Sequence, residues 1–347
     1  MRYKDMHMIA RLKQRFLSAS ERGTFFRASV QWGFLLWCMI AGIRFGLFVS
    51  GFGDGGVPVF SRPPSVEGFL PIGALLSLRH WVSTGVIHTF HPAALVLLVT
   101  FLTMSLIGKK SFCSFICPVG TISERLWRGG KSALGRNWRP WPYLDISLRG
   151  AKYLLLYFFI NITFLKMPTR ALGGFLNSSY WAIADVKMLF FFTRMSVLVI
   201  GVLAALVFLS VIYKNFWCRY LCPYGALVGV LSFASPWKIR RREEHCIECG
   251  TCARGCPFHL PVDRKLVVRS VECTGCLTCV SNCPADGALA MTVPVLKRPL
   301  PPWVYPLFIL FVFSIGVGWG MASGYWQTSL TIADYRSLIP MAASIGH

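Results

Sequence analysis

The sequence predicts an all-α, polytopic membrane protein of about five transmembrane helices that carries a small cytoplasmic α+β module rich in cysteine. Three observations lead to this prediction. The 347 residues are 54% hydrophobic and only 14% charged, with a mean hydropathy of +0.54, which is too apolar for a soluble globular protein. Long apolar segments recur along the chain, with basic residues between them. Eight of the 13 cysteines fall in two short runs before the last apolar segment.

Five segments are apolar enough to cross a bilayer, which takes about 17–25 residues of helix. We predict spans at 30–49, 92–107, 152–167, 195–213 and 303–321. The second and third are short, so their limits are the least well defined. The segment 68–90 is also apolar, but it carries Arg79, His80 and His88, and we expect an amphipathic interfacial segment there instead of a sixth span.

The basic residues predict the orientation. Segments 1–28, 109–152 and 214–298 hold 28 of the 36 Lys and Arg residues, whereas 51–90, 166–194 and 322–347 together hold seven. This bias places the N-terminus and the cysteine runs in the cytoplasm and the C-terminus in the periplasm of a bacterial inner membrane. We therefore attribute the net charge of +22 to the orientation of the chain in the membrane, and we expect no nucleic-acid partner. Residues 1–28 are too long and polar for a signal peptide, so we expect the first span to stay attached.

The cysteine runs have one form, Cys246-x2-Cys249-x2-Cys252-x3-Cys256-Pro257 and Cys273-x2-Cys276-x2-Cys279-x3-Cys283-Pro284. This spacing is typical of two [4Fe–4S] clusters, in which the cysteine before proline ligates the neighbouring cluster. Zinc sites rarely need two identical runs of this kind, and disulfides are disfavoured in a reducing compartment. The predicted ligand sets are therefore crossed: Cys246, Cys249, Cys252 and Cys283 for one cluster, and Cys273, Cys276, Cys279 and Cys256 for the other.

The residues around these runs predict a ferredoxin-like module held together by its metal. Val267-Val268 and 289–293 fit short strands, and the module has too little apolar material for a core of its own. The predicted organisation is a basic cytoplasmic N-terminus (1–28), a transmembrane region with two Cys-x3-Cys-Pro repeats (29–237), the module with two [4Fe–4S] clusters (238–293), and a final transmembrane helix with an outer C-terminal tail (294–347).

An internal repeat places a second group of cysteines at the inner membrane surface. Residues 109–120 align with 214–225, each following a predicted span, and each copy contains Cys-x3-Cys-Pro-x-Gly. Cysteines four residues apart share one helix face, so the two copies could bring four thiolates together around a third iron–sulfur centre. The alternative is a helix-breaking turn whose thiols only pack. The cysteines concerned are Cys113, Cys117, Cys218 and Cys222.

Clusters on the inner side alone cannot serve the outer side of a hydrocarbon layer about 30 Å thick. Either a quinone binds within the membrane or another cofactor bridges the gap. The candidate groups near a quinone head group are His88, His91, Tyr180 and Asp185. The candidate haem ligands are His80, His88 and His91, although interfacial histidines are more often structural.

Three further features have ordinary interpretations that we favour. Arg44 lies in the first span, close enough to its outer end to reach water. Arg240, Arg241 and Arg242 fit a cytoplasmic anchor, with an acidic donor protein or anionic lipid as the alternative partner. Cys38, in the first span, is outside every motif, and we interpret it as a small apolar side chain that fills space between helices.

Together these motifs resemble the NapH/NosR group of membrane polyferredoxins over nearly the whole chain. The resemblance rests on residues 64–72, both Cys-x3-Cys-Pro motifs, Cys273-Thr274-Gly275-Cys276 and the tail Gly324-Tyr325-Trp326-Gln327. It implies an inner-membrane electron carrier with two [4Fe–4S] clusters that exchanges electrons with quinol, and it supports the eight ligands named above. NosR-type proteins carry a large outer flavin-binding domain before the first span. Only about 28 residues precede the first predicted span here, so we expect no covalent flavin.

The predicted function is a relay of single electrons between a quinol pool or cytoplasmic donor and an unidentified partner. The sequence shows no nucleophile, general base or nucleotide loop, so we expect no bond-making catalysis beyond quinol dehydrogenation. Two other classes stay open. One is an accessory or maturation factor that supplies electrons for assembly of an extracytoplasmic metalloenzyme, and the other is a membrane redox sensor.

Overall fold

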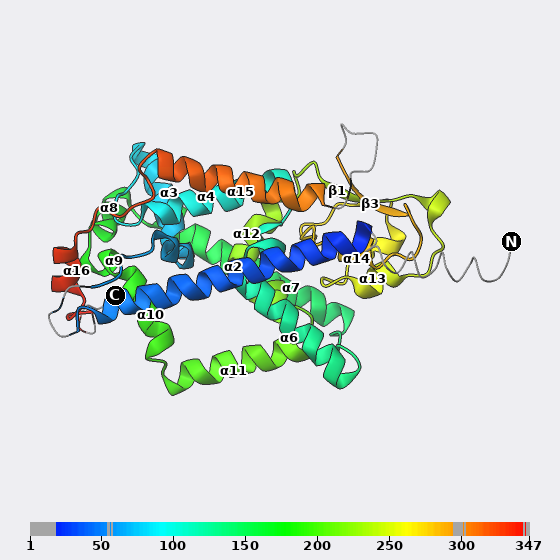
Figure 1. Cartoon of the computed structure of the whole chain (residues 1–347), viewed down its shortest axis with the longest axis horizontal. Helices are drawn as coiled ribbons and strands as arrows, with labels where there is room; N and C mark the ends of the chain where they lie inside the picture. Colours follow the sequence, from blue (N-terminus) through cyan, green and yellow to red (C-terminus); the bar gives the residue numbers. More distant parts are fainter. Residues whose placement is uncertain are drawn as a thin grey trace.

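The computed structural model describes residues 19–53, 56, 58–293, 301, 303–342 and 344. Its helices form an elongated bundle (Figure 1). The cysteine-rich module, with α13 (Thr251–Gly255) and α14 (Thr278–Ser281), lies at one end of the bundle. The opposite end is formed by α8 (Thr169–Leu176), α9 (Ser179–Ala182), α10 (Ala184–Thr193) and α16 (Ile332–Leu338).

Each predicted span contains a helix, but a count of five is not confirmed. The helices are α2 (Ala19–Ser50), α4 (Pro92–Gly108), α7 (Pro142–Ile160), α11 (Val197–Ile212) and α15 (Val304–Ala322). Within the described chain, three segments are long and apolar enough to cross a membrane: Thr24–Ser50, Pro142–Lys166 and Val304–Ala322. A fourth exists if α10 and α11, which meet at a bend of 78°, form one broken span. At 17 residues, α4 is too short to meet the same criterion.

The third predicted span begins ten residues earlier than expected. We predicted a start at residue 152, but α7 begins at Pro142 and continues as the π-helical segment η2 (Asn161–Lys166). The charges that suggested a loop are neutralised inside the protein. Asp145 accepts hydrogen bonds from Arg219 at 2.7 and 2.8 Å and pairs with Arg149 at 3.2 Å. The added turns of α7 therefore contain charged residues that are paired within the protein.

The segment 68–90 contains the end of the short element η1 (Pro64–Phe69) and the whole of α3 (Pro71–Thr84). The residues from Gly73 to Ser77 are buried, and Ala74 and Leu75 pack with Ala94 and Leu98 of α4. With 14 residues, α3 spans about 21 Å and is too short to cross a bilayer. The first half of this segment therefore belongs to the helical core, and its position at the membrane interface stays a prediction.

The two sequence repeats have matching local structures, and the last helix of each copy packs on the first helix of the other. In the first copy α4 leads to α5 (Phe112–Phe115) and α6 (Pro118–Leu134), and in the second α11 leads to η3 (Trp217–Leu221) and α12 (Pro223–Leu231). Helix α6 packs on α11, where a side chain at Gly130 would collide with the carbonyl of Val211. Helix α12 packs on α4 in turn. This exchange brings the two cysteine motifs together at the module end of the bundle.

The module contains an antiparallel sheet of order β2-β1-β3, built from β1 (Lys238–Arg241), β2 (Val267–Val268) and β3 (Leu289–Thr292), with short turns η4 (Glu243–His245) and η5 (Val262–Arg264). Both predicted strands are confirmed. The central strand β1 was not predicted, because we read its arginines as a membrane anchor. Ile239 of β1 pairs with Val268 and Met291, and these residues share one core with Tyr305 and Ile309 of α15. The module therefore packs directly on the membrane helices.

Candidate functional site

Four cysteines from the two runs line a buried cavity beside the sheet. They are Cys256 from the first run and Cys273, Cys276 and Cys279 from the second. Apolar side chains, including Ile239, Val268 and Leu277, complete the wall. Three of the four cysteines are less than 10% exposed. The fold thus brings together the same four residues that the spacing groups for one cluster.

The other four cysteines line a second cavity nearer the surface. They are Cys246, Cys249, Cys252 and Cys283, again drawn from both runs. Cys249 is exposed, whereas Cys252 is buried. Arg241 of β1 contributes to this wall and pairs with Glu243 at 2.9 Å, while Arg240 and Arg242 are exposed. One of the three predicted anchor arginines therefore faces the cysteine cavity.

The arrangement of these thiols suits a cluster better than a single ion. All 13 cysteines are free, and no group of three His, Cys, Asp or Glu side chains in the described residues converges closely enough to hold one metal ion. A zinc site would need such a group, with sulfur about 2.3 Å from the metal. A [4Fe–4S] cluster instead distributes four thiolates around a cube, which matches a cavity lined by four separate cysteines.

The backbone follows the same path in both runs. The residues on either side of the middle cysteine have positive φ in each case: Glu248 (54°) and Gly250 (66°) in the first run, Gly275 (65°) and Leu277 (59°) in the second. This conformation is disfavoured for residues such as Glu and Leu. Because it recurs at equivalent positions, it belongs to the loop that directs three cysteines of each run toward one cavity.

The repeat cysteines occupy matching positions at helix boundaries. Cys113 and Cys218 lie within the short elements α5 and η3, and Cys117 and Cys222 are the N-cap residues of α6 and α12, each followed by Pro. The Sγ of Cys222 accepts a hydrogen bond from the N–H of Gly225 at 3.2 Å. A helix N-terminus stabilises negative charge, and a thiolate in this position gains from it.

The two repeat motifs occupy one region of the fold, since α12 packs on α4 and α6 contacts η3. Burial raises the pKa of Cys218 well above its usual range, and the thiols of Cys222, Cys117 and Cys113 raise that pKa further, while Lys110 opposes the rise. Each cysteine is buried or half-buried. That these four thiols share one centre stays a prediction.

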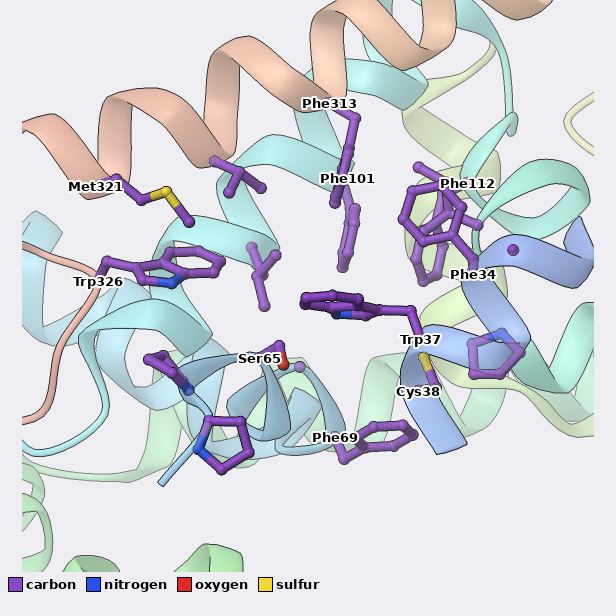
Figure 2. Close-up of a pocket in the computed structure, with 18 of the residues that line it drawn as sticks. Phe34, Trp37, Cys38, Ser65, Phe69, Phe101, Phe112, Phe313, Met321 and Trp326 are labelled. Carbon is purple, nitrogen blue, oxygen red and sulfur yellow. The ribbon is translucent and has the colours of Figure 1, made fainter. Parts of the chain in front are cut away.

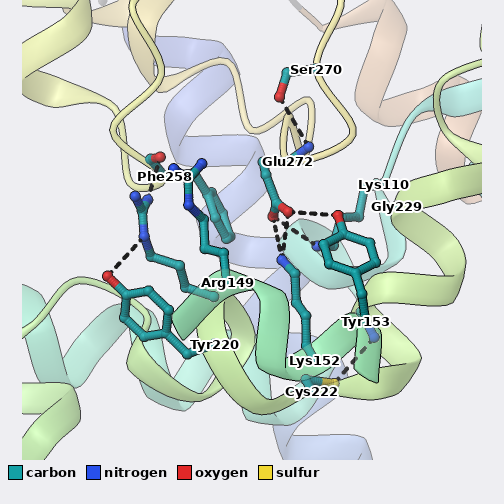
Figure 3. A network of polar contacts seen from close by, with 12 residues as sticks. Lys110, Arg149, Lys152, Tyr153, Tyr220, Cys222, Gly229, Phe258, Ser270 and Glu272 are labelled. Carbon is teal, nitrogen blue, oxygen red and sulfur yellow. Dashed lines mark hydrogen bonds and ion pairs between the residues drawn. The ribbon is translucent and has the colours of Figure 1, made fainter. Parts of the chain in front are cut away.

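A buried polar network joins the repeat motif to the module (Figure 3). The ammonium group of Lys110 lies 3.6 Å from a carboxylate oxygen of Glu272, the residue before Cys273, and it makes no hydrogen bond among the described residues. Lys152 donates to both oxygens of Glu272 at 2.6 Å, and the hydroxyl of Tyr153 donates at 2.9 Å. The pKa of Glu272 is lowered: burial alone would raise it, but Lys110 and Lys152 more than offset that effect.

A second buried cation contacts both cysteine regions from α2. Arg27 donates to the carbonyl of Ser114, next to Cys113, and to the carbonyl of Cys276, both at 3.2 Å. It also forms an ion pair with Glu124 of α6. Sequence reasoning missed these roles because it counted Arg27, Lys110 and Lys152 as topology signals. The position of Lys110 in the repeat and of Glu272 beside a cysteine are the signals that could have revealed them.

The polar groups predicted at the other end have these partners in the structure, and their role as quinone or haem ligands stays a prediction. His91 is buried, with Nε2 2.8 Å from the carbonyl of Trp181 and Nδ1 3.4 Å from Glu67. Asp185 pairs with Arg62 at 2.7 Å, and Arg62 also pairs with Glu67 at 2.9 Å. The predicted haem candidates His80 and His88 have ring centroids 5.9 Å apart. The remaining quinone candidate, Tyr180, has Lys187 over its ring.

Comparison with known proteins agrees with the cysteine geometry. A family model described as a 4Fe-4S dicluster domain matches residues 238–291, and one described as a 4Fe-4S binding domain matches 90–140 and 195–242, the two repeats. The "Putative electron transport protein YccM" of Escherichia coli (strain K12) is 43% identical over 295 residues, which cover 83% of this chain and 82% of that protein. The chain belongs to the YccM family.

Two more distant relatives of this YccM-family chain are named as ferredoxin-type proteins. Ferredoxin-type protein NapH of Haemophilus influenzae is 25% identical over 52% of the chain and 63% of its own length. Methylamine utilization ferredoxin-type protein MauN of Paracoccus denitrificans is 27% identical over 48% of the chain and 54% of its own length. No solved structure matches. The YccM-family chain is thus an iron–sulfur electron transport protein with membrane-spanning helices.

Proposed function

We propose that this protein relays single electrons through three iron–sulfur centres arranged from the surface of the module toward the membrane. The observation that supports this most directly is the grouping of eight cysteines around two cavities, with the four repeat cysteines at matching positions of two motifs in one region of the fold. The outer set of the module is Cys246, Cys249, Cys252 and Cys283, the inner set is Cys256, Cys273, Cys276 and Cys279, and the repeat set is Cys113, Cys117, Cys218 and Cys222. When bound, a [4Fe–4S] cluster supplies reversible one-electron transfer.

The order of the sets follows their exposure. Cys249 of the outer set is exposed and accessible to a soluble partner, whereas the inner set is buried between the sheet and the repeat motifs. Arg27 and the Lys110–Glu272 pair connect the inner set with the repeat set. The protein therefore has one exposed point of contact and one that adjoins the membrane helices.

The third centre is supported by the charge around the repeat set. Lys110 is 1% exposed and has no hydrogen-bond partner in the described part of the chain. Buried cations are costly unless a negative group compensates them, and Glu272 already serves Lys152. Four thiolates on an iron–sulfur centre would supply the missing negative charge. The match of a 4Fe-4S binding domain to both repeats supports the same assignment.

We further propose that the module lies in the cytoplasm and the C-terminus in the periplasm of an inner membrane, and that a quinol pool or a cytoplasmic donor exchanges electrons with an unidentified partner. The bias of Lys and Arg supports the orientation. The module contacts the first half of α2, and α16 lies at the opposite end of the bundle (Figure 1).

The proposed function is tested in anaerobic membranes containing the protein. We expect an added quinol to reduce centres that are visible by EPR. Replacing Cys249 and Cys276 by Ser should remove the signals of the two module centres and leave that of the repeat centre. Reduction by dithionite with none by quinol would restrict the donor to a cytoplasmic protein. The absence of any reducible iron–sulfur signal would overturn the proposal. An under-metallated periplasmic enzyme in a deletion strain with normal respiration would instead favour the accessory role.

A further inference from the structure

A large apolar cavity lies between α2, η1, α4 and α15, away from the cysteine cavities (Figure 2). Its volume is about 860 Å³, within the range of small-molecule sites. Aromatic side chains dominate the wall, and Trp37, Phe101 and Phe313 face its centre. The polar and charged side chains that line it come from the end of α2, the segment before and within η1, and the tail after α15: Arg44, Ser61, Arg62, Ser65 and Gln327.

The cavity is long and ends beside the first repeat motif. On α2 its lining runs from Val30 to Arg44, a rise of about 20 Å. Phe112, Ile116 and Pro118 line the end away from Arg44, and they are interleaved with Cys113 and Cys117. Aromatic contacts continue from this wall. The ring centroids of Phe101 and Phe112 are 4.0 Å apart, and those of Phe112 and Tyr224 are 5.6 Å apart.

Arg62 provides a buried donor at the polar end. Its side chain is 6% exposed, and two of its nitrogens are held by Asp185 and Glu67. The third nitrogen, Nη1, has no hydrogen-bond partner in the described residues. A buried donor without a partner is uncommon and costs stability unless a ligand or water satisfies it. The ion pairs with Asp185 and Glu67 hold this guanidinium in place beside the cavity.

We propose that this cavity binds a quinone, with a ring carbonyl near Arg62 and the isoprenoid chain along the aromatic wall. The inference rests on the proposed electron-transfer function, in its form with a quinol as the redox partner near the repeat cysteines. A molecule with one polar end and a long apolar body matches the distribution of polar groups in the wall. A phospholipid acyl chain has a similar shape, but the cavity reaches Phe112, Ile116 and Pro118, the sequence neighbours of Cys113 and Cys117, which favours a redox-active lipid. The proposed site adjoins part of the group predicted from the sequence, since Arg62 contacts Asp185 at 2.7 Å and His91 at 3.3 Å.

Gly33 offers a way to block the cavity without disturbing the fold. It lines the cavity, and a side chain added there meets no atom within 4 Å. Gly42 is a matched control, because it is on the same helix, also has open space around it, and does not line the cavity. Leucine at either position fills space on α2, but only Gly33→Leu fills the cavity.

The experiment measures binding of decylubiquinone to anaerobically purified full-length protein in lipid nanodiscs, followed by quenching of tryptophan fluorescence. We expect saturable binding to the wild type, about tenfold weaker binding to Gly33→Leu, and unchanged binding to Gly42→Leu. Equal affinities in all three proteins would overturn the proposal. So would co-purified phospholipid that Gly33→Leu displaces in a protein with no saturable quinone binding, because the cavity would then hold a lipid.

Iron content measured on the same samples distinguishes failure of the quinone site from failure of the iron–sulfur relay. Full iron content without quinone binding would overturn the quinone site and leave the iron–sulfur relay intact. A wild-type protein without iron would overturn the relay, whatever its affinity for decylubiquinone.

Discussion

The ammonium nitrogen of Lys110 lies 3.6 Å from a carboxylate oxygen of Glu272, and both side chains are buried. One residue belongs to the first repeat motif, and the other precedes Cys273 of the module. Since Lys152 binds the same carboxylate, two buried cations share one anion. This excess of positive charge beside the repeat thiols explains how the fold can accommodate an anionic centre there.

Replacing Lys110 by Met is expected to lower the midpoint potential of the repeat centre by roughly 50–100 mV. Removal of a nearby positive charge destabilises the reduced, more negative state, and a unit charge several ångströms away is worth about 2 kcal/mol at an effective dielectric constant near 20. Redox titration monitored by EPR measures the shift. Lys131→Met, at an exposed position of α6, is the control and should leave the midpoint potential unchanged. An unchanged potential in Lys110→Met would contradict the assigned role.

Replacing Glu272 by Gln is expected to destabilise the protein by about 3–5 kcal/mol, because Lys110 and Lys152 lose their shared counter-ion in a buried setting. Chemical unfolding of the purified protein measures the change. Glu243→Gln is the matched control, since the Glu243 side chain is 64% exposed where it pairs with Arg241. A surface pair of that kind contributes at most about 1 kcal/mol. Equal effects of the two substitutions would show that the buried network is unimportant for stability.

Removing iron with a chelator under oxidising conditions is expected to unfold residues 238–293 and leave most helices folded. We expect the positive φ at Glu248 and Leu277 and the two cysteine cavities to depend on the clusters that the loops would hold. Limited proteolysis should then cut first within the module, while far-UV circular dichroism changes little. A module that stays protease-resistant without iron would mean that its contacts with α15 suffice to hold it.

The orientation predicts opposite results for reporters at the two ends of the bundle. Alkaline phosphatase fused to the C-terminus is expected to be active, because that end should reach the periplasm, whereas a fusion ending within α12 should be inactive. Green fluorescent protein fusions provide the reciprocal control. The reverse pattern would invert the topology and expose the module to the periplasm.

The cysteine spacing predicted the chemistry because ligand geometry is local. The crossed grouping, the strand at Val267–Val268 and the matching repeats all follow from patterns within a few residues. Burial of Lys110 and the early start of α7 could not be predicted in this way. Both depend on partners more than 70 residues distant in sequence, Glu272 for Lys110 and Arg219 for Asp145. The cavity along α2 could not be predicted from the sequence either, since its wall comes from four separate segments.

Iron and acid-labile sulfide counting on anaerobically purified protein tests the central claim most directly. With three [4Fe–4S] centres we expect about twelve irons per wild-type chain, and about eight after Cys113, Cys117, Cys218 and Cys222 are replaced by Ala. Eight irons in both proteins would contradict the third centre and confine the relay to the module.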